Sequence, residues 1–300
     1  MSARRSLAER LVLGAPWVWL AVFFLIPFLI VVKISLSQAA LAQPPYTPAF
    51  DLADGWEAML GKLGELCLAA YAGLADDWLY AQAYLSSLRM ALISTAFTLA
   101  VAYPMAYAMA RAPEHLRPAL LLLAIAPFWT SFLIRVYAWI TILKDEGLLN
   151  HALLSLGIIS EPLHIFATDG AVVIGIVYSY LPFMVLPLYN AIARQPPELR
   201  EAAADLGASP TAAFWRITVP LSAPGILAGC LLVFIPAIGE FVTPDLLGGS
   251  DTLMIGRTLW VEFFDNRDWP AASAVAVVLL ALLVAPMALY ERSQMAEAPP

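Results

Sequence analysis

Six apolar stretches run through the 300-residue chain, and each is long enough to cross a bilayer as a helix. About 20 helical residues cover the roughly 30 Å of hydrocarbon in a membrane. The chain is also 61% hydrophobic and only 13% charged, whereas a typical soluble domain is about 25% charged. These features predict an all-α, polytopic membrane protein with six transmembrane helices. The stretches are Leu11–Ile34, Tyr84–Ala110, Pro118–Leu143, Gly170–Ala193, Val219–Leu246 and Pro270–Tyr290.

The first stretch shares some features with a secretory signal peptide. Arginines precede it, and the small-residue sequence Ala40-Leu41-Ala42 follows it. However, the apolar run from Leu11 to Val32 exceeds the roughly 7–15 residues of a signal peptide's hydrophobic region. This length favours a helix that is retained.

Lysine and arginine are unevenly distributed between the two sides of the six predicted helices. Cytoplasmic loops of membrane proteins are enriched in these residues. If both termini lie on one side, that side holds nine arginines and the other holds four basic residues. The first group is Arg4, Arg5, Arg10, Arg111, Arg117, Arg194, Arg200, Arg216 and Arg292, and the second is Lys62, Lys144, Arg257 and Arg267. We therefore expect both termini to be cytoplasmic.

The sequence suggests a division into three parts. Residues 1–83 hold the first helix and an outer segment, residues 84–292 form a core with the other five stretches, and residues 293–300 form a cytoplasmic tail.

The outer segments carry many carboxylates, among them Asp77 and Asp268. These either form an ordinary solvated surface or concentrate cations at the outer mouth.

One charged interruption, EAAADLGASPTAAFWRITVP, lies within residues 196–220, before the fifth apolar stretch. An apolar stripe recurs at helical spacing from Leu199 to Leu206. Gly207 follows where that helix should end, and Ser209-Pro210 is a typical start for a second helix, which we expect to run to Pro220. The segment is predicted to form a helix, a sharp turn and a helix outside the membrane, which either dock another protein or cap the bundle.

The same segment resembles the EAA signature of ABC-importer permeases. Glu201-Ala202-Ala203, three residues, Gly207, nine residues, Ile217, one residue and Val219-Pro220 match its spacing, with valine where leucine is usual. In that family the loop docks onto a separate cytoplasmic ATPase. The resemblance implies an ATPase-coupling element that consists of Glu201, Ala202, Ala203, Gly207, Ser209 and Pro210. The chain has no G-x-x-x-x-G-K-[ST] phosphate loop, so ATP and Mg²⁺ would bind to the partner and no cofactor is expected in this chain.

Longer segments resemble the putrescine/spermidine importer permeases, over about Tyr84–Arg292. These are Pro127–Asn150, Gly175–Tyr189, Val233–Gly249 and Met254–Leu280. The resemblance implies a type I ABC-importer permease fold with cytoplasmic coupling helices, in a bacterial inner membrane. The implied partners are an ATPase dimer, a second similar permease subunit and an external solute-binding protein, with no nucleic acid. The implied role is that of a transport subunit, not an enzyme, which moves putrescine or spermidine inward by alternating access.

Two charged residues, Arg135 and Glu240, fall within the third and fifth apolar stretches. Charge inside a membrane is costly unless it is paired or hydrated, so such residues are functional candidates. Counted at about 1.5 Å per residue, their depths are similar, which allows an ion pair. Alternatively, Glu240 attracts a cationic amine and nearby aromatic rings contribute cation–π contacts, although such rings are also common as interface anchors. The predicted substrate-pathway residues are Glu240, Arg135, Tyr137, Tyr178 and Tyr180, with Trp139 as a further aromatic neighbour.

Other functional classes have less support. Cys67 and Cys230 leave no disulfide framework and no metal-ligand spacing, and no Ser/His/Asp or Cys/His arrangement predicts a catalytic site. A different small solute within the same class stays open, as does a gradient-driven secondary transporter with Arg135 and Glu240 as its relay. A receptor or scaffold is disfavoured because the sequence shows no sizeable soluble domain.

Overall fold

The computed structural model describes residues 7–50 and 55–297. The chain divides into two compact units: unit 1 comprises Met1–Ala81 with Thr258–Pro300, and unit 2 comprises Gln82–Arg257. Apart from two short paired strands, the described elements are helices. This confirms the prediction of an all-α protein.

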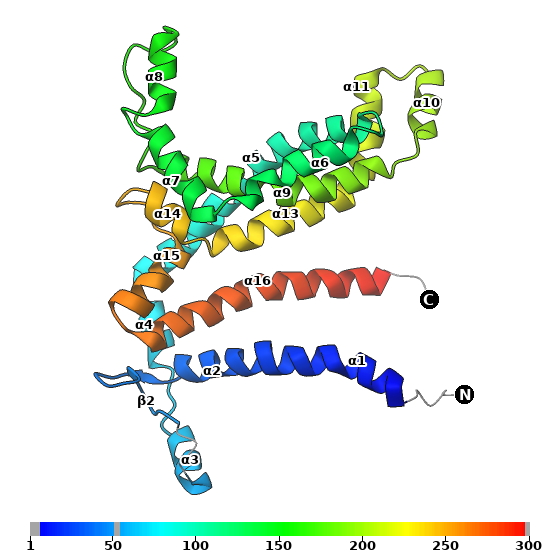
Figure 1. Ribbon diagram of the computed structural model, residues 1–300. Helices are drawn as coiled ribbons and strands as arrows, with labels where there is room; N and C mark the ends of the chain where they lie inside the picture. The colour runs from blue at the N-terminus through cyan, green and yellow to red at the C-terminus, as the bar shows by residue number, and fades with distance from the viewer. Residues whose placement is uncertain (1–6, 51–54, 298–300) are drawn as a thin grey trace. The chain divides into compact units, whose positions relative to one another are not determined.

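Unit 1 contains a long apolar helix that lies beside the C-terminal helix (Figure 1). α1 (Leu7–Leu20), η1 (Ala21–Leu25) and α2 (Ile26–Ser35) follow one another without a break, and η1 is a π-helix. α16 (Trp269–Glu297) contacts α2 and runs in the opposite direction, so α1 begins and α16 ends at the same end of the unit. Large apolar side chains such as Trp17, 75% exposed, cover the outside of the first helix, as expected for a surface in contact with lipid.

The segment between the first helix and α5 is tied to α2 by side-chain contacts. β1 pairs with β2 antiparallel, with Gln38 opposite Thr47. The Ser35 and Tyr71 hydroxyls lie 2.8 Å apart and link α2 to α4. Lys33 Nζ donates a hydrogen bond to the Pro48 carbonyl. The elements here are β1 (Gln38–Ala39), β2 (Tyr46–Thr47), α3 (Trp56–Leu63), α4 (Ala69–Asp76) and, before α16, η4 (Val261–Asp265).

Unit 2 is a bundle of helices, of which several are interrupted. α8 and α14 lie at one end of it, and α10 and α11 lie at the other end (Figure 1). Its helices are α5 (Trp78–Arg111), α6 (Arg117–Ile125), η2 (Ala126–Trp129), α7 (Phe132–Leu143), α8 (Leu148–Ser155), α9 (Asp169–Ala193), α10 (Glu198–Asp205), α11 (Pro210–Ala213), η3 (Phe214–Thr218), α12 (Val219–Leu221), α13 (Ala223–Ile238), α14 (Val242–Leu247) and α15 (Ile255–Trp260). α5 and α15 each continue across the boundary between the units.

α9 and α13 pack closely because glycines of α13 face α9. A methyl group at Gly229 would lie 2.6 Å from Met184 Sδ, and one at Gly225 would lie 2.8 Å from the Pro187 carbonyl oxygen. Small residues at helix interfaces allow such close approach in membranes, where packing replaces the hydrophobic effect. The core around this contact consists of Ala102, Ala106, Met109, Ala110, Met184, Val185, Leu188, Ile192 and Val233.

Each predicted apolar stretch overlaps a helix or a bent pair of helices. Three described helices are long and apolar enough to cross a membrane: Val12–Ser35, Trp78–Arg111 and Asp169–Ala193. Two bent pairs satisfy the same requirement together: Arg117–Trp129 with Phe132–Ser155, at 87°, and Pro210–Leu221 with Ala223–Ile238, at 63°. The sixth stretch corresponds to a shorter apolar helix, Trp269–Val284. The count of six membrane crossings stays a prediction.

The third and fifth stretches are not the continuous helices that the sequence suggested. The third breaks after η2, where Thr130 and Ser131 are extended. The fifth bends at Ser222, shortly after its start, and breaks again between Ile238 and Val242. Proline contributes to the first break, since Pro127 lies in η2 and has no N–H to donate.

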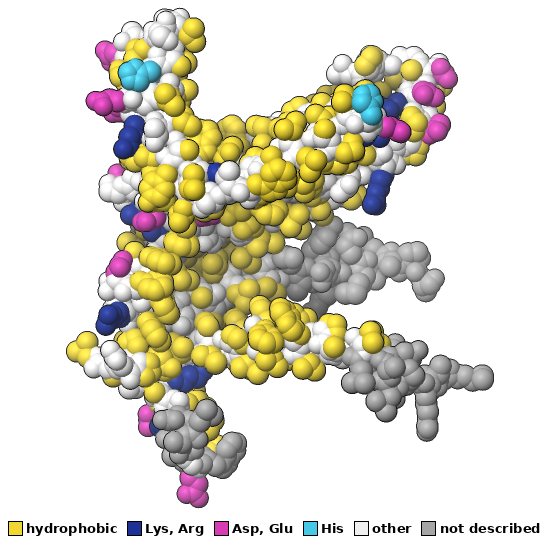
Figure 2. Space-filling view, viewed as in Figure 1, with side chains coloured by type: hydrophobic (Ala, Val, Ile, Leu, Met, Phe, Trp, Pro, Cys, Tyr) yellow, Lys and Arg dark blue, Asp and Glu magenta, His cyan; other side chains and the backbone are white. Residues whose placement is uncertain are grey.

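Polar side chains in unit 2 gather at its two ends. Figure 2 shows hydrophobic side chains along the middle of the unit, with acidic side chains beside α10 at one end and near α8 at the other. An apolar band between polar ends is the distribution that a bilayer imposes.

The predicted division into residues 1–83, 84–292 and 293–300 stays a prediction. The compact units differ from it in one respect: α16 belongs to unit 1, where it packs on α2. Of the predicted tail, residues 293–297 continue α16. Residues 298–300 lie outside the described residues, as do Arg4 and Arg5 of the orientation argument.

Candidate functional site

The predicted helix–turn–helix is present at one end of unit 2. α10 ends at Asp205, and Gly207 follows with φ of +81°, in the left-handed region. Ala208 N–H donates to the Ala203 carbonyl at 2.9 Å and Gly207 N–H to the Ala204 carbonyl at 2.9 Å, which is the hydrogen-bond pattern of a glycine-terminated helix. The next helix begins at Pro210, as the sequence predicted.

Ser209 caps the second helix. Its Oγ accepts a hydrogen bond from Ala212 N–H at 3.2 Å, which satisfies one of the free amides of the first turn. The helix then runs past the predicted end at Pro220 and stops at Leu221, before the bend at Ser222. The predicted second helix is therefore present, and it ends one residue later than expected. The π-helix at Phe214–Thr218 alters the hydrogen-bond pattern just before the proline, with Val219 N–H bonded to Phe214 O.

The residues of the predicted ATPase-coupling element differ in their exposure. Glu201, Ala202, Gly207, Ser209 and Pro210 are exposed, whereas Ala203 is only 9% exposed. Leu206, which belongs to the apolar stripe of α10, is 89% exposed. The stripe is therefore mostly uncovered by the described chain, whereas an element that capped the bundle would bury it.

Arg135 closes the break between η2 and α7. It is 8% exposed, and its NH1 donates hydrogen bonds to the carbonyls of Pro127 and, at 2.9 Å, Thr130. Its Cζ lies 5.5 Å from the Phe128 ring centroid and 5.8 Å from that of Phe132. Its Nε has no hydrogen-bond partner among the described residues. Arg135 thus donates to two carbonyls at the helix break, and the Pro127 carbonyl also accepts from Thr130 N–H at 3.3 Å.

Glu240 lies in the break between α13 and α14 and is 7% exposed. Its Oε2 accepts a hydrogen bond from the Tyr180 hydroxyl at 2.6 Å, and its Oε1 accepts one from Thr243 N–H at 3.3 Å. Arg135 forms no salt bridge with Glu240, and its NH1 donates to backbone carbonyls instead. The structure therefore does not form the ion pair that the sequence allowed, and each residue lies at a different helix break.

The predicted aromatic residues do not form one cage. Tyr180 is the only one of them with a contact to Glu240 among the described residues. Tyr178 packs edge-on against Trp139, with ring centroids 5.4 Å apart, at an apolar hollow of about 670 Å³. Tyr137 is 57% exposed. The structure thus joins Tyr180 to Glu240 and leaves the other tyrosines apart from it.

Some polar links were not predicted from the sequence. Arg89 NH2 donates to Asp169 Oδ2 at 2.9 Å, and the Thr252 hydroxyl donates to Asp169 Oδ1 at 2.9 Å. The Tyr103 and Ser222 hydroxyls lie 2.9 Å apart. Their partners are 80 or more residues apart in the chain, so no local spacing indicates them.

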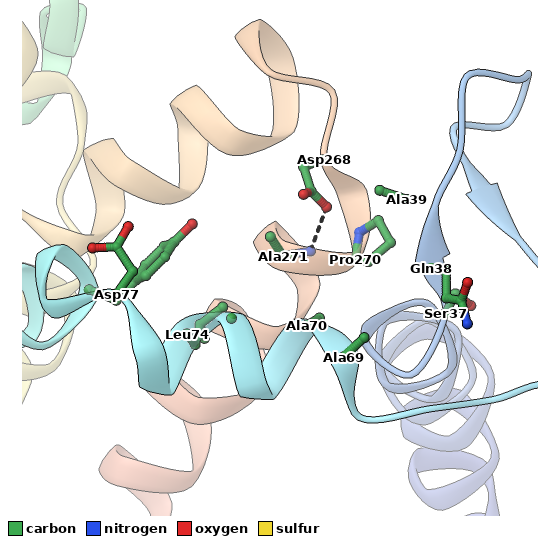
Figure 3. A pocket seen from close by; sticks show the side chains of 12 residues that line it. Ser37, Gln38, Ala39, Ala69, Ala70, Leu74, Asp77, Asp268, Pro270 and Ala271 are labelled. Carbon is green, nitrogen blue, oxygen red and sulfur yellow. Dashed lines mark hydrogen bonds between the residues drawn. The ribbon is translucent and has the colours of Figure 1, made fainter.

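Two of the carboxylates that are predicted to lie outside the membrane cap the starts of helices. Asp77 Oδ1 accepts from Leu79 N–H at 2.9 Å, and Asp268 Oδ1 accepts from Ala271 N–H at 2.9 Å. Both line a hollow of about 440 Å³ in unit 1, between α4, β1 and the start of α16 (Figure 3). These contacts favour a structural role for the two residues over attraction of cations.

Comparison with protein families covers nearly the whole chain. The family of "Binding-protein-dependent transport system inner membrane component" matches residues 10–293. The chain belongs to this family. As a member of it, the chain is a multi-pass inner-membrane permease component, which is a transport subunit and not an enzyme.

Curated relatives of the permease include two very similar proteins. The "Spermidine/putrescine transport system permease protein PotB" of Salmonella typhimurium (strain LT2) is 48% identical over 223 residues, which cover 74% of this chain and 77% of the relative. The protein of the same name from Escherichia coli (strain K12) is 47% identical over 223 residues, which cover 74% of this chain and 81% of the relative.

The fold of the permease also matches a solved importer. A chain of a bacterial ABC transporter involved in the import of the acidic polysaccharide alginate aligns with a TM-score of 0.66 at 16% identity, and the match covers 94% of both chains. At this identity the likeness concerns the fold alone. It confirms the predicted ABC-importer permease fold.

Proposed function

We propose that this chain is the permease subunit of an ATP-driven importer that moves a polyamine, putrescine or spermidine, into a bacterial cell. The observation that carries the proposal is the 48% identity to a spermidine/putrescine permease over 223 residues. The proposed partners are a cytoplasmic ABC ATPase dimer, which binds ATP and Mg²⁺, a second similar permease subunit and an external solute-binding protein. Both termini lie in the cytoplasm.

The element formed by α10, Gly207 and α11 is the proposed docking site for the ATPase. Its apolar stripe is exposed at Leu206 and Leu199, which are 89% and 43% exposed, and an uncovered apolar surface beside charged groups suits a protein partner. Glu201 and Asp205 lie exposed on the same short helix. Gly207 makes the turn that presents both helices.

The proposed transport path passes Glu240. Its carboxylate is buried and receives hydrogen bonds from Tyr180 and Thr243, but none of the salt bridges of the described residues involves it. A buried carboxylate without a cationic partner costs free energy, and a cationic amine in transit would supply the missing charge. Arg135 holds a helix break and, in this proposal, acts on the shape of the path.

Alternating access supplies the mechanism. ATP binding closes the two ATPase subunits, the motion reaches the permease through residues 198–221, and the helices of both permease subunits reorient around a central path. A ligand that binds the two states with different affinity shifts the equilibrium between them. Here the ligands are the loaded binding protein and ATP.

Reconstitution tests the proposal. The permease, the ATPase, the second permease and the binding protein are incorporated into proteoliposomes, and uptake of labelled spermidine and putrescine is measured with ATP, without ATP and with an uncoupler. We expect uptake that requires ATP and withstands the uncoupler. Uptake that withstands ATP depletion and collapses with the uncoupler would instead establish a gradient-driven transporter.

A different cargo within the same class is the second candidate. The matched importer of alginate shows that this fold also serves a cargo that is acidic and polymeric. Competition of labelled spermidine uptake by unlabelled amino acids, organophosphonates and polyamines decides between the cargoes. Replacement of Glu240 by Gln should lower polyamine uptake if the carboxylate faces the path, and undiminished uptake and selectivity would remove Glu240 from it.

A further inference from the structure

The second coupling helix is attached to α5 by one aromatic side chain. Phe214, in η3, packs edge-on against Tyr103 at a centroid distance of 5.6 Å and against Tyr107 at 5.3 Å, both with an interplanar angle of 89°. Tyr103 and Tyr107 are four residues apart on α5 and so lie on the same face. The Phe214 ring therefore lies between two successive turns of a 34-residue helix.

A hydrogen bond fixes the bend that follows. Ser222 lies between the helices that meet at 63° and has no exposed surface. Its Oγ donates to the Val219 carbonyl at 2.8 Å, so it accepts from the Tyr103 hydroxyl, which is 2.9 Å away. Tyr103 thus contacts the coupling helix with its ring and the bend with its hydroxyl.

The surroundings of this contact leave space for movement. A hollow of about 550 Å³ lies beside it, lined by Ala96, Leu99, Pro104 and Ile226 together with the rings of Tyr103 and Phe214. Phe214–Thr218 is a π-helix, a form that is often found at functional sites. A close-packed interface would leave less open space beside the contact.

α5 in turn packs on α9, the helix whose Tyr180 donates a hydrogen bond to Glu240. Ala102, Ala106 and Met109 of α5 form one buried cluster with Met184 and Leu188 of α9. Tyr180, one turn earlier on α9, donates the hydrogen bond to Glu240. A continuous series of packed residues therefore leads from Phe214 to the buried carboxylate.

We propose that Phe214 transmits movement of the coupling loop to α5, and that the hydrogen bond between Tyr103 and Ser222 keeps the bend aligned with it. The inference rests on the proposed function, since it requires an ATPase that moves the loop. Phe214 is a positioning residue: it acts through Tyr103 and Tyr107 and touches no cargo. A rival route leads through Gln195, whose Nε2 donates to the Thr218 carbonyl at 3.0 Å and ties the loop to the end of α9.

The test compares Phe214→Leu with Phe97→Leu in the reconstituted complex. Phe97 lies on α5, is 58% exposed and does not line the hollow beside Phe214, so it is a matched control. We expect Phe214→Leu to lower spermidine uptake per ATP hydrolysed about tenfold, within the usual range of coupling between two sites. ATP hydrolysis and thermal stability stay near wild type, and Phe97→Leu changes none of the three quantities.

Conservative variants separate transmission from simple structural loss. Phe214→Tyr keeps a ring between the two tyrosines, so its uptake per ATP hydrolysed should stay near that of the wild type. Tyr103→Phe keeps the ring contact but loses the hydrogen bond, so it should lower uptake per ATP by a smaller factor than Phe214→Leu does. Parallel loss of ATP hydrolysis, uptake and stability in Phe214→Leu, without rescue by Phe214→Tyr, overturns the inference. So does uncoupling by Gln195→Ala together with full coupling in Phe214→Leu.

A second readout requires no cargo. In a background with serine at Cys67 and Cys230, Ala108→Cys places a thiol on the exposed side of α5, and its maleimide labelling rate is compared with and without ATP and vanadate. The inference predicts a nucleotide-dependent change that Phe214→Leu abolishes and Phe97→Leu preserves. If the labelling rate still depends on nucleotide in Phe214→Leu, the inference is overturned but the proposed function stands. A wild-type complex without ATP-dependent uptake contradicts the proposed function itself.

Discussion

At Gly207 the backbone has φ of +81°, and a Cβ there would meet nothing within 4 Å. Substitution by alanine therefore adds no clash, and its cost is the left-handed conformation itself, about 1–2 kcal/mol. We expect Gly207→Ala to loosen the turn between α10 and α11 and to speed amide hydrogen exchange in residues 198–213, with the rest of the bundle unchanged. Gly61→Ala, which also meets open space but has no such φ, is the control. Equal exchange in both variants would show that the turn tolerates a side chain.

At Gly256 a substitution is limited by space and not by backbone conformation. A Cβ there would lie 2.4 Å from the Gly239 carbonyl oxygen and 2.6 Å from that of Glu240. These are backbone atoms and cannot rotate away, so Gly256→Ala should destabilise the protein by about 1–3 kcal/mol, as overpacking usually does. The measurement is the thermal midpoint in detergent, with Gly14→Ala as control because nothing lies within 4 Å of its Cβ. An unchanged midpoint in Gly256→Ala would mean that the break at Glu240 can shift.

Helices and turns were predictable to different degrees. The turn at Gly207 and the cap at Ser209 were predicted correctly, because each depends on residues within about four positions of it. The helix breaks were not predicted, because proline does not mark them reliably. Pro104 and Pro182 lie inside continuous helices, whereas a helix ends at Ser222, which is not a proline. Whether a proline breaks a helix in a membrane depends on which neighbours satisfy the freed carbonyls, and those neighbours are distant in the sequence.

The same limit explains why the sequence left the pairing of Arg135 with Glu240 open. Matched depth and opposite charge were the only sequence evidence, and they do not specify rotation about the helix axis. In the structure Arg135 turns to carbonyls five and eight residues earlier in the chain. Glu240 meets Tyr180, 60 residues away, a contact that no local pattern contains.

Two double-mutant cycles test the assignment of the helix breaks. Tyr180→Phe with Glu240→Gln should show a coupling energy of about 1–3 kcal/mol, because the 2.6 Å hydrogen bond joins a buried carboxylate to its donor. Arg135→Met with Glu240→Gln should be additive within about 0.5 kcal/mol, as for residues without a shared partner. Unfolding free energies in detergent provide both values. Strong coupling in the second cycle and none in the first would reinstate the ion pair.

For the molecule as a whole, the sequence predicted an all-α membrane protein and the positions of its apolar helices. It did not predict which helices pack against one another. Length and hydropathy alone identify stretches that suit a membrane, and each of the six predicted stretches overlaps a helix or a bent pair. That the first and last of them pack together in unit 1 depends on contacts across more than 200 residues. No periodicity within a stretch encodes such a contact.

The orientation of the whole chain is the last prediction. The distribution of arginine places α10 in the cytoplasm and α3 outside, and the antiparallel α2 and α16 place the start of α1 and the end of α16 on one side. In a background without native cysteines, a thiol at Gly61, which is exposed on α3, should react with a membrane-impermeant maleimide in intact spheroplasts. A thiol at Leu206, 89% exposed, should react only after permeabilisation. The reverse pattern would invert the topology and, because an ATPase can dock only from the cytoplasm, would remove residues 198–221 as its site.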